Sequence, residues 1–346
     1  MPALHPTAYR RNRESTLGMG FHCQGDRDVD TQFSDRIPTI QSVHAGLTST
    51  GYIPSRQIST ALFLAMRLGK PILAEGPAGV GKTELAKATA EFLGLPLVRM
   101  QCYDGLDESK ALYEWKYGKQ LLYTQILKEK VSAVLSKDDT MDQALARLHE
   151  FDDIFFSDRF LEPRPLLKAL LEPKGAVLLI DEIDKADEEF EAFLLEILSD
   201  HQVTIPEIGT IRAIVKPVVI LTSNNTRDLG DAMKRRCLHL HIGYPDPKLE
   251  EQIIDSRIPG IEDSLRRQLV SFVQQLRGLD LRKLPSVSET IDWARAILLL
   301  NASRLESEVV RDTLNLLLKF EGDMTMGGKA VGEMVHKALR EGGVEG

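Results

Sequence analysis

The sequence has few cysteines and no pair of them at close spacing. Cys23, Cys102 and Cys237 are the only three among 346 residues. Zinc ribbons and disulfide frameworks both need paired cysteines, so the sequence predicts neither. We therefore expect a chain that works in a reducing, cytoplasmic compartment.

Long apolar runs and an excess of basic charge are also missing. No stretch approaches the roughly 20 apolar residues of a transmembrane helix, and residues 1–30 lack the apolar segment of a secretory signal. We therefore expect no membrane partner. The 43 basic and 51 acidic residues give a net charge of -8. Because a non-specific nucleic-acid coat needs a basic surface, nucleic acid is an unfavoured partner, unless a ring encloses a local basic channel.

The pattern of apolar residues divides the chain into three parts. Residues 1–36 show no periodicity and predict a flexible arm. From 37 to 245, helical patterns alternate with short apolar runs typical of buried strands, at 71–74, 97–100, 176–180, 218–221 and 238–242. From 246 to 346 the pattern is helical only. The sequence thus predicts an α/β fold, a doubly wound parallel sheet of the P-loop type, followed by a small all-helical domain.

A glycine-rich segment between the first strand and the next helix is the strongest signal. It reads Gly76-Pro77-Ala78-Gly79-Val80-Gly81-Lys82-Thr83. Glycines let successive backbone N–H groups point at phosphate oxygens, and the helix predicted from Lys82 to about Leu93 adds its positive end. Lys82 is expected to reach the β- and γ-phosphates of ATP, and Thr83 to ligate Mg²⁺.

A second motif lies where an apolar strand ends in acids, Leu178-Leu179-Ile180-Asp181-Glu182-Ile183-Asp184. Asp181 is expected to hold Mg²⁺ through water, as a Walker B acid does. Glu182 would orient or deprotonate the attacking water and is the candidate general base. Alone, such a pattern is equally typical of a solvated helix cap. Downstream of a phosphate loop it indicates a site built for hydrolysis.

Two further polar motifs lie later in the chain, one directly after a predicted strand and one directly before the last strand. Thr222-Ser223-Asn224-Asn225 ends the strand at 218–221, where ligands bind in such sheets. Asn224, or alternatively Asn225, could hold the attacking water, although these residue types also cap helices. Lys234-Arg235-Arg236 precedes the last strand. It is either a solvated basic patch at a helix end or an arginine finger for a neighbouring subunit.

In this order, the motifs resemble those of AAA+ ATPases, and more narrowly those of the MoxR branch. A predicted hairpin from His201 to Ile211 corresponds to the pre-sensor hairpin of that branch. Arg236 matches the finger position better than Arg235. The segment from Leu284 to Ala294, LPSVSETIDWA, resembles the CoxD-like subgroup. The resemblance spans about residues 55–303.

The resemblance implies a homo-oligomeric, hexameric ring with shared active sites and with ATP and Mg²⁺ as ligands. It also implies a von Willebrand factor A domain partner and a metalloenzyme client, possible examples being molybdenum hydroxylases such as carbon monoxide dehydrogenase. Arg282, or else Lys283, would serve as the second sensor, although neither matches the motif closely. Two other functions stay open, a nucleic-acid motor and a nucleotide-gated scaffold.

The segment between the second strand and the Walker B motif is long for such a core, because Lys82 and Asp181 lie 99 residues apart. It predicts an insert in the helix after the second strand, with a hairpin near Trp115–Leu122 and a polar helix near Met141–His149. The aromatic residues from Tyr113 to Tyr117 are either a contact loop for a client or a buried hairpin.

Overall fold

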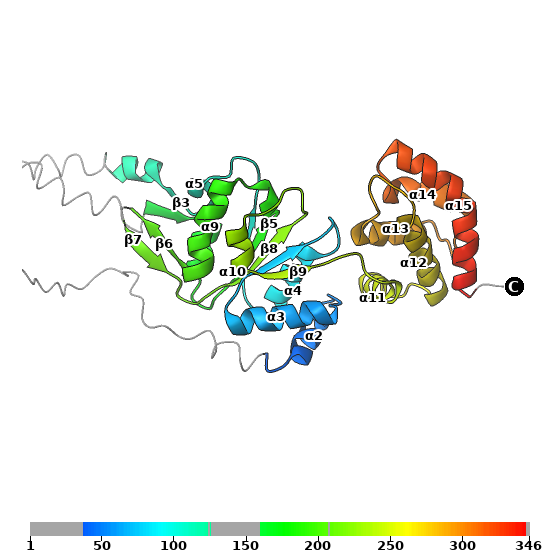
Figure 1. Ribbon diagram of the computed structural model, residues 1–346, viewed down its shortest axis with the longest axis horizontal. Helices are drawn as coiled ribbons and strands as arrows, with labels where there is room; N and C mark the ends of the chain where they lie inside the picture. Colours follow the sequence, from blue (N-terminus) through cyan, green and yellow to red (C-terminus); the bar gives the residue numbers. More distant parts are fainter. Residues whose placement is uncertain (1–36, 124, 126–159, 207, 344–346) are drawn as a thin grey trace, which may run out of the picture.

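A computed structural model describes residues 37–123, 125, 160–206 and 208–343 (Figure 1). The predicted arm at 1–36 and the predicted polar helix at Met141–His149 lie outside the described residues. Most of the expected insert lies outside them as well.

A five-stranded parallel sheet forms the centre of the α/β region, by which we mean residues 37–242. Its order is β2-β5-β8-β1-β9, and every neighbouring pair is parallel. All five strands coincide with predicted apolar runs: β1 (Ile72–Glu75), β2 (Leu97–Gln101), β5 (Val177–Asp181), β8 (Val218–Ser223) and β9 (Leu238–His241). The order brings β5, β8 and β1 together, although they are far apart in sequence.

Both faces of the sheet are covered, which confirms the doubly wound arrangement. Leu178 and Ile180 of β5 belong to one apolar cluster, whereas Val177 and Leu179 belong to another. Successive side chains of a strand point to opposite faces, so each face has its own core. The covering helices are α8 (Pro165–Leu171) and α9 (Glu188–Asp200) on one face, and α2 (Ile40–Ser49), α3 (Arg56–Leu68) and α4 (Lys82–Leu93) on the other. Figure 1 shows α9 and α3 on opposite sides of the sheet.

The segment after β2 differs from its prediction. Helix α5 (Glu108–Ala111) is followed by β3 (Tyr113–Trp115), which pairs with the distant β4 (Leu161–Pro163). The predicted hairpin at 115–122 is wrong, because residues 117–123 are helical. Gln120 is buried there and Tyr123 packs edge-on against Phe160, and a spacing of three residues places both on one helix face.

The aromatic residues at 113–117 fit neither of the two alternatives completely. Trp115 is buried and lies edge-on to Tyr113 in β3, whereas the side chain of Tyr117 is exposed. The predicted pre-sensor hairpin is confirmed: β6 (Gln202–Ile205) pairs antiparallel with β7 (Gly209–Arg212). A 3-10 turn (Ile183–Lys185) follows β5, and α10 (Asp231–Arg236) precedes β9.

Helices alone make up the helical region, by which we mean residues 247–343. Its core surrounds Trp293 and Phe272, which are fully buried and whose ring centroids lie 5.2 Å apart. The helices are α11 (Pro247–Arg257), α12 (Asp263–Arg277), α13 (Val287–Leu299), α14 (Ser307–Leu317) and α15 (Glu321–Glu341). Asp246 caps α11 by accepting from the Leu249 N–H. Within the described ranges, no helix has the length and apolar character needed to cross a bilayer.

Candidate functional site

The glycine-rich loop leaves the end of β1 in a backbone conformation that needs glycine. Gly76, Gly79 and Gly81 have φ values of 150°, 75° and 98°. A Cβ on Gly76 would lie 2.0 Å from the Ile242 carbonyl oxygen, so the loop passes directly against the chain after β9. Glycine is therefore required for space as well as for backbone freedom, and the loop delivers Lys82 to the start of α4.

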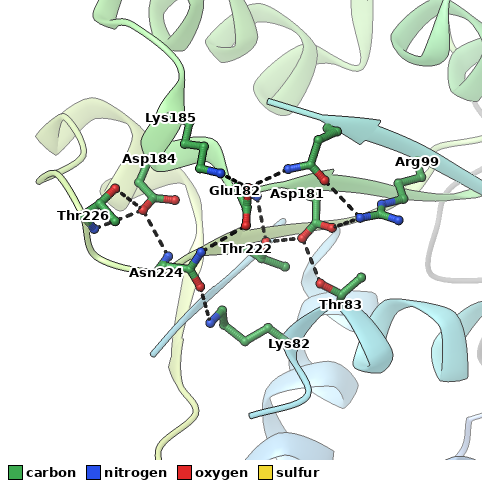
Figure 2. A network of polar contacts seen from close by, with 11 residues as sticks. Lys82, Thr83, Arg99, Asp181, Glu182, Asp184, Lys185, Thr222, Asn224 and Thr226 are labelled. Carbon is green, nitrogen blue, oxygen red and sulfur yellow. Dashed lines mark hydrogen bonds and ion pairs between the residues drawn. The ribbon is translucent and has the colours of Figure 1, made fainter. Parts of the chain in front are cut away.

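The side chain of Lys82 is buried and turned toward the loop. Its Nζ donates to the carbonyl oxygens of Gly76 and Pro77, both at 2.7 Å, and to Asn224 Oδ1 at 2.9 Å. Burial lowers the pKa of Lys82 below its ordinary value, although three nearby carboxylates act in the opposite direction. A loop lysine and a residue after β8 thus meet across 142 positions of sequence (Figure 2).

Asp181 lies at the end of β5 and is 3% exposed. Its Oδ1 accepts from the Thr83 hydroxyl at 2.9 Å and from the Thr222 hydroxyl at 2.6 Å, while Oδ2 accepts from Arg99 Nη2 at 2.7 Å. The two residues predicted to bind Mg²⁺, Thr83 and Asp181, are therefore in contact (Figure 2). Hydroxyl and carboxylate oxygens are the hard ligands that Mg²⁺ prefers, so this pair fits the ion.

Glu182 follows immediately in the left-handed region, at φ 57° and ψ 51°. This conformation costs a residue other than glycine about 1–2 kcal/mol, and such strain gathers at functional sites. The turn directs its carboxylate toward the end of β8, where Oε1 accepts from Asn224 Nδ2 at 3.3 Å. Its Oε2 accepts from Gln101 Nε2 at 2.8 Å and from Lys185 Nζ at 2.5 Å.

The loop after β8 is held by Asp184. Its Oδ2 accepts from the backbone N–H groups of Asn224 and Thr226 and from the Thr226 hydroxyl, at 3.2, 3.0 and 2.6 Å. Burial opposes ionisation of Asp184, but these hydrogen bonds outweigh it and its pKa lies below the ordinary value. Asn224 is thereby fixed between Lys82 and Glu182. Asn225, the alternative sensor, instead bonds Ser223 through its backbone N–H.

The predicted arginines lie elsewhere on the molecule. Arg235 and Arg236 are exposed at the end of α10, and Arg236 Nε donates to Ser199 Oγ at 2.5 Å. Arg282 stacks over the Phe320 ring at 4.3 Å, and Lys283 pairs with Glu289 at 3.0 Å. The two sensor candidates of the helical region thus have their contacts within that region.

Several residues of the site were not predicted from the sequence. Thr222 accepts from the Glu182 backbone N–H at 2.9 Å while it donates to Asp181, so one hydroxyl ties both acids together. Lys185, Arg99 and Gln101 bond the acids from the outside. The available signal was the alternation in β2, where polar residues 99 and 101 flank buried Met100 beside the Walker B strand.

The helical region reaches the phosphate loop at one point. Both the backbone N–H and the hydroxyl of Ser288 donate to the Gly79 carbonyl oxygen at 3.3 Å. A Cβ on Gly79 would lie 2.5 Å from Ser286 Oγ. Arg257 of α11 adds an ion pair with Glu84 of α4 at 2.8 Å. The start of α13 therefore rests on the loop expected to hold phosphate.

Comparisons with known proteins found a matching family and similar relatives. Residues 71–237 match the family described as an AAA domain of the dynein-related subfamily. Uncharacterized proteins of Staphylococcus aureus strains NCTC 8325 and COL are each 26% identical over 237 residues, covering 67% of this chain and 76% of theirs.

Solved structures similar to this chain include two structures of RuvB from Thermotoga maritima. A mutant RuvB has a TM-score of 0.44 at 18% identity, over 82% of this chain and 73% of its own. The RuvB described as a Holliday junction branch migration motor has a TM-score of 0.41 at 17% identity, over 84% and 74%. The matched family segment contains the loop, both acids, Asn224 and both α10 arginines. Residues 71–237 thus match an AAA domain, and the general function that this match supports is that of an AAA+ ATPase.

Proposed function

We propose that this protein is a magnesium-dependent ATP hydrolase. One observation carries the proposal: Lys82 and Thr83 after β1 meet Asp181 and Glu182 after β5 and Asn224 after β8 through direct hydrogen bonds. These three strands are neighbours in the sheet, and ligands of open α/β sheets bind at the carboxyl ends of the strands. A purely structural glycine turn would not need this set of polar residues.

Each side chain has a role that follows from its contacts. The loop N–H groups would hold the phosphates, and Lys82 would exchange its carbonyl partners for phosphate oxygens. Thr83 and Asp181 would hold Mg²⁺, which neutralises charge on the β- and γ-phosphates. Glu182 and Asn224 lie 3.3 Å apart. An attacking water beside this pair could donate its proton to Glu182 while Asn224 fixes its orientation.

Steady-state phosphate release and nucleotide binding test this proposal directly. The wild-type protein should hydrolyse ATP only when Mg²⁺ is present. Lys82→Ala should lose nucleotide binding, because the buried cation that faces the phosphates is gone. A wild-type protein that binds no adenine nucleotide under any condition would defeat the proposal.

We also propose that the protein assembles into a hexameric ring, with residues 37–245 and 246–346 as its two domains. The support is that Arg235 and Arg236 are exposed on α10, where a guanidinium can reach a neighbouring molecule. An arginine supplied in trans accelerates phosphoryl transfer by about 10³–10⁵. Arg236 is the proposed finger, with Arg235 as the alternative.

Mixing inactive subunits tests the shared site. Arg236→Ala and Lys82→Ala subunits are each expected to be inactive as pure samples. In mixed rings, an intact finger from a Lys82→Ala subunit would complete the site of an Arg236→Ala neighbour, so some activity should return. If no activity returns at any mixing ratio, Arg236 does not act as a finger in trans. A mixture of Arg235→Ala with Lys82→Ala subunits then tests whether Arg235 is the finger instead.

The cellular role that we propose is a cytoplasmic MoxR-type chaperone that remodels a metalloenzyme together with a von Willebrand factor A domain protein. The client would be a molybdenum hydroxylase such as carbon monoxide dehydrogenase. The support is the resemblance of the motifs, together with a hairpin at β6–β7 and a CoxD-like segment whose Ser288 contacts Gly79. Co-purification with such a partner tests this role, whereas ATPase stimulation by DNA would instead favour a nucleic-acid motor.

A further inference from the structure

The edge strand β2 presents two polar side chains to the acids of the candidate site. Arg99 and Gln101 are two residues apart and so lie on the same side of the strand, while Val98 and Met100 are buried in an apolar cluster. In register, Gln101 is opposite Asp181 and Arg99 is opposite Leu179. The edge strand therefore adds a cation and an amide where magnesium is expected.

Arg99 binds the carboxylate oxygen of Asp181 that does not accept from the hydroxyls of Thr83 and Thr222. Oδ1 already accepts from Thr83 and Thr222, whereas Oδ2 accepts from Arg99 Nη2 at 2.7 Å (Figure 2). The carboxylate is nearly fully buried, but half of the Arg99 side chain is exposed to solvent. The guanidinium therefore approaches from the solvent side and can withdraw without opening the core.

Gln101 holds the guanidinium in this position. The same Arg99 Nη2 also donates to Gln101 Oε1 at 3.0 Å, and Gln101 Nε2 donates to Glu182 Oε2 at 2.8 Å. The amide is thus oriented from one side by Glu182 and fixes Arg99 from the other. This arrangement keeps a positive charge on the carboxylate that a divalent cation would need.

We propose that Arg99 is a positioning residue that competes with Mg²⁺ for Asp181, with Gln101 as the side chain that orients it. An oxygen that accepts from the guanidinium is less available to the ion or to a water molecule bound to it, and the two positive charges repel each other at that distance. Arg99 would thereby raise the Mg²⁺ concentration at which the site accepts the ion with nucleotide. The inference rests on the proposed nucleotide site.

The test is a Mg²⁺ titration of protein with bound fluorescent ADP, read as the concentration at half-maximal fluorescence change. We expect Arg99→Gln to lower this midpoint about tenfold, because the substitution removes a unit positive charge a few ångströms from the ion in a partly exposed site. Arg99→Lys keeps the charge and should stay within about threefold of wild type. Gln101→Leu only loosens the partly exposed Arg99–Asp181 pair, so it should lower the midpoint about two- to threefold. The control is Arg311→Gln on the exposed face of α14, which should leave it unchanged.

The outcomes separate this inference from the proposed function. ADP binding without Mg²⁺ should be equal in wild type and the control Arg311→Gln, and thermal unfolding shows separately whether Arg99→Gln is folded. An Arg99→Gln midpoint equal to or above that of wild type overturns the competition. A wild-type protein that binds no ADP defeats the nucleotide site itself. If Arg99→Gln does not fold, the Gln101→Leu midpoint decides, and no decrease overturns the inference.

Discussion

Two buried carboxylates, one in each region of the molecule, are both paired with an arginine, yet they are built for different purposes. Glu250 of the helical region is fully buried, and Arg277 grips both of its oxygens at 2.7 Å with only 6% of the arginine side chain exposed. Asp181 of the α/β region is bonded by Arg99 at one oxygen, from solvent. We call the Glu250–Arg277 pair the closed site, because solvent hardly reaches it. We call Asp181 and its neighbours the open site, because Arg99 can leave Asp181 and a metal ion can take its place.

The surroundings of Glu250 explain why it is closed. Gln274 donates to Oε2 at 2.7 Å and Thr290 to Oε1 at 3.1 Å, so every oxygen has two donors. Arg277 Nε donates to the Pro285 carbonyl at 2.8 Å, and its guanidinium lies 4.8 Å from the Tyr244 ring centroid. The two arginines also differ in exposure, since half of the Arg99 side chain is exposed to solvent and only 6% of the Arg277 side chain.

The largest expected effect is a fall in kcat at the open site without a matching loss of stability. Glu182→Gln removes the proposed general base, so kcat should fall about 10²–10⁴-fold. Nucleotide affinity should persist, and the free energy of unfolding should change by no more than about 1 kcal/mol, because the side chain is partly exposed and glutamine keeps its size and shape. Phosphate release and urea unfolding measure the two quantities. Glu189→Gln, on the exposed face of α9, is the control, and equal rates for wild type and Glu182→Gln would refute the assignment.

At the closed site we expect a large loss of stability. Glu250→Gln leaves the Arg277 guanidinium buried without its counter-charge, which should lower the free energy of unfolding by about 3–5 kcal/mol. Urea denaturation measures it, with Glu333→Gln on the exposed face of α15 as the matched substitution, expected within about 0.5 kcal/mol of wild type. If both variants unfold at the same urea concentration, Glu250 is not the structural pair that we describe.

A smaller effect is expected from replacing a glycine in each region by alanine and comparing the loss of stability. Gly76 of the phosphate loop and Gly260 of the helical region both have positive φ, at 150° and 87°, but only Gly76 lies against another backbone atom. Replacement by alanine should cost about 1–3 kcal/mol from the backbone at either position. The clash with the Ile242 carbonyl should make Gly76→Ala the more destabilised of the two in thermal unfolding. Equal losses of stability in the two variants would mean that the loop can shift to make room for the added Cβ atom.

The smallest effect is expected where the two regions touch. Ser288→Ala removes the hydroxyl bond to the Gly79 carbonyl but leaves the backbone N–H bond. An exposed hydrogen bond contributes about 0.5–1.5 kcal/mol, so ADP affinity should fall by no more than about tenfold. Ser303→Ala, exposed in the same region, should bind ADP as wild type does. A complete loss of binding in Ser288→Ala would show that α13 forms part of the nucleotide site.

Local patterns predicted most of the fold. The five sheet strands and the β6–β7 hairpin follow from apolar runs bounded by glycine, proline or polar residues. The pairing of β3 with β4 did not, because the partners are separated by a long segment and each strand has only three residues. A pattern this short has no periodicity from which to choose between strand and helix, and the nearest polar and aromatic residues suggested a local hairpin instead.

The sequence by itself predicted a phosphate loop, since eight consecutive residues supply both the backbone freedom and the cation, and it pointed to Asp181, Glu182 and Asn224 by their positions at the ends of apolar strands. Only the tertiary structure decided how they are joined. Thr222 bridges the acids, Asp184 holds the Asn224 loop, and Arg99 neutralises Asp181 because the order β2-β5-β8-β1 places distant strand ends side by side. Contacts between residues far apart in sequence depend on this order, which no local pattern specifies.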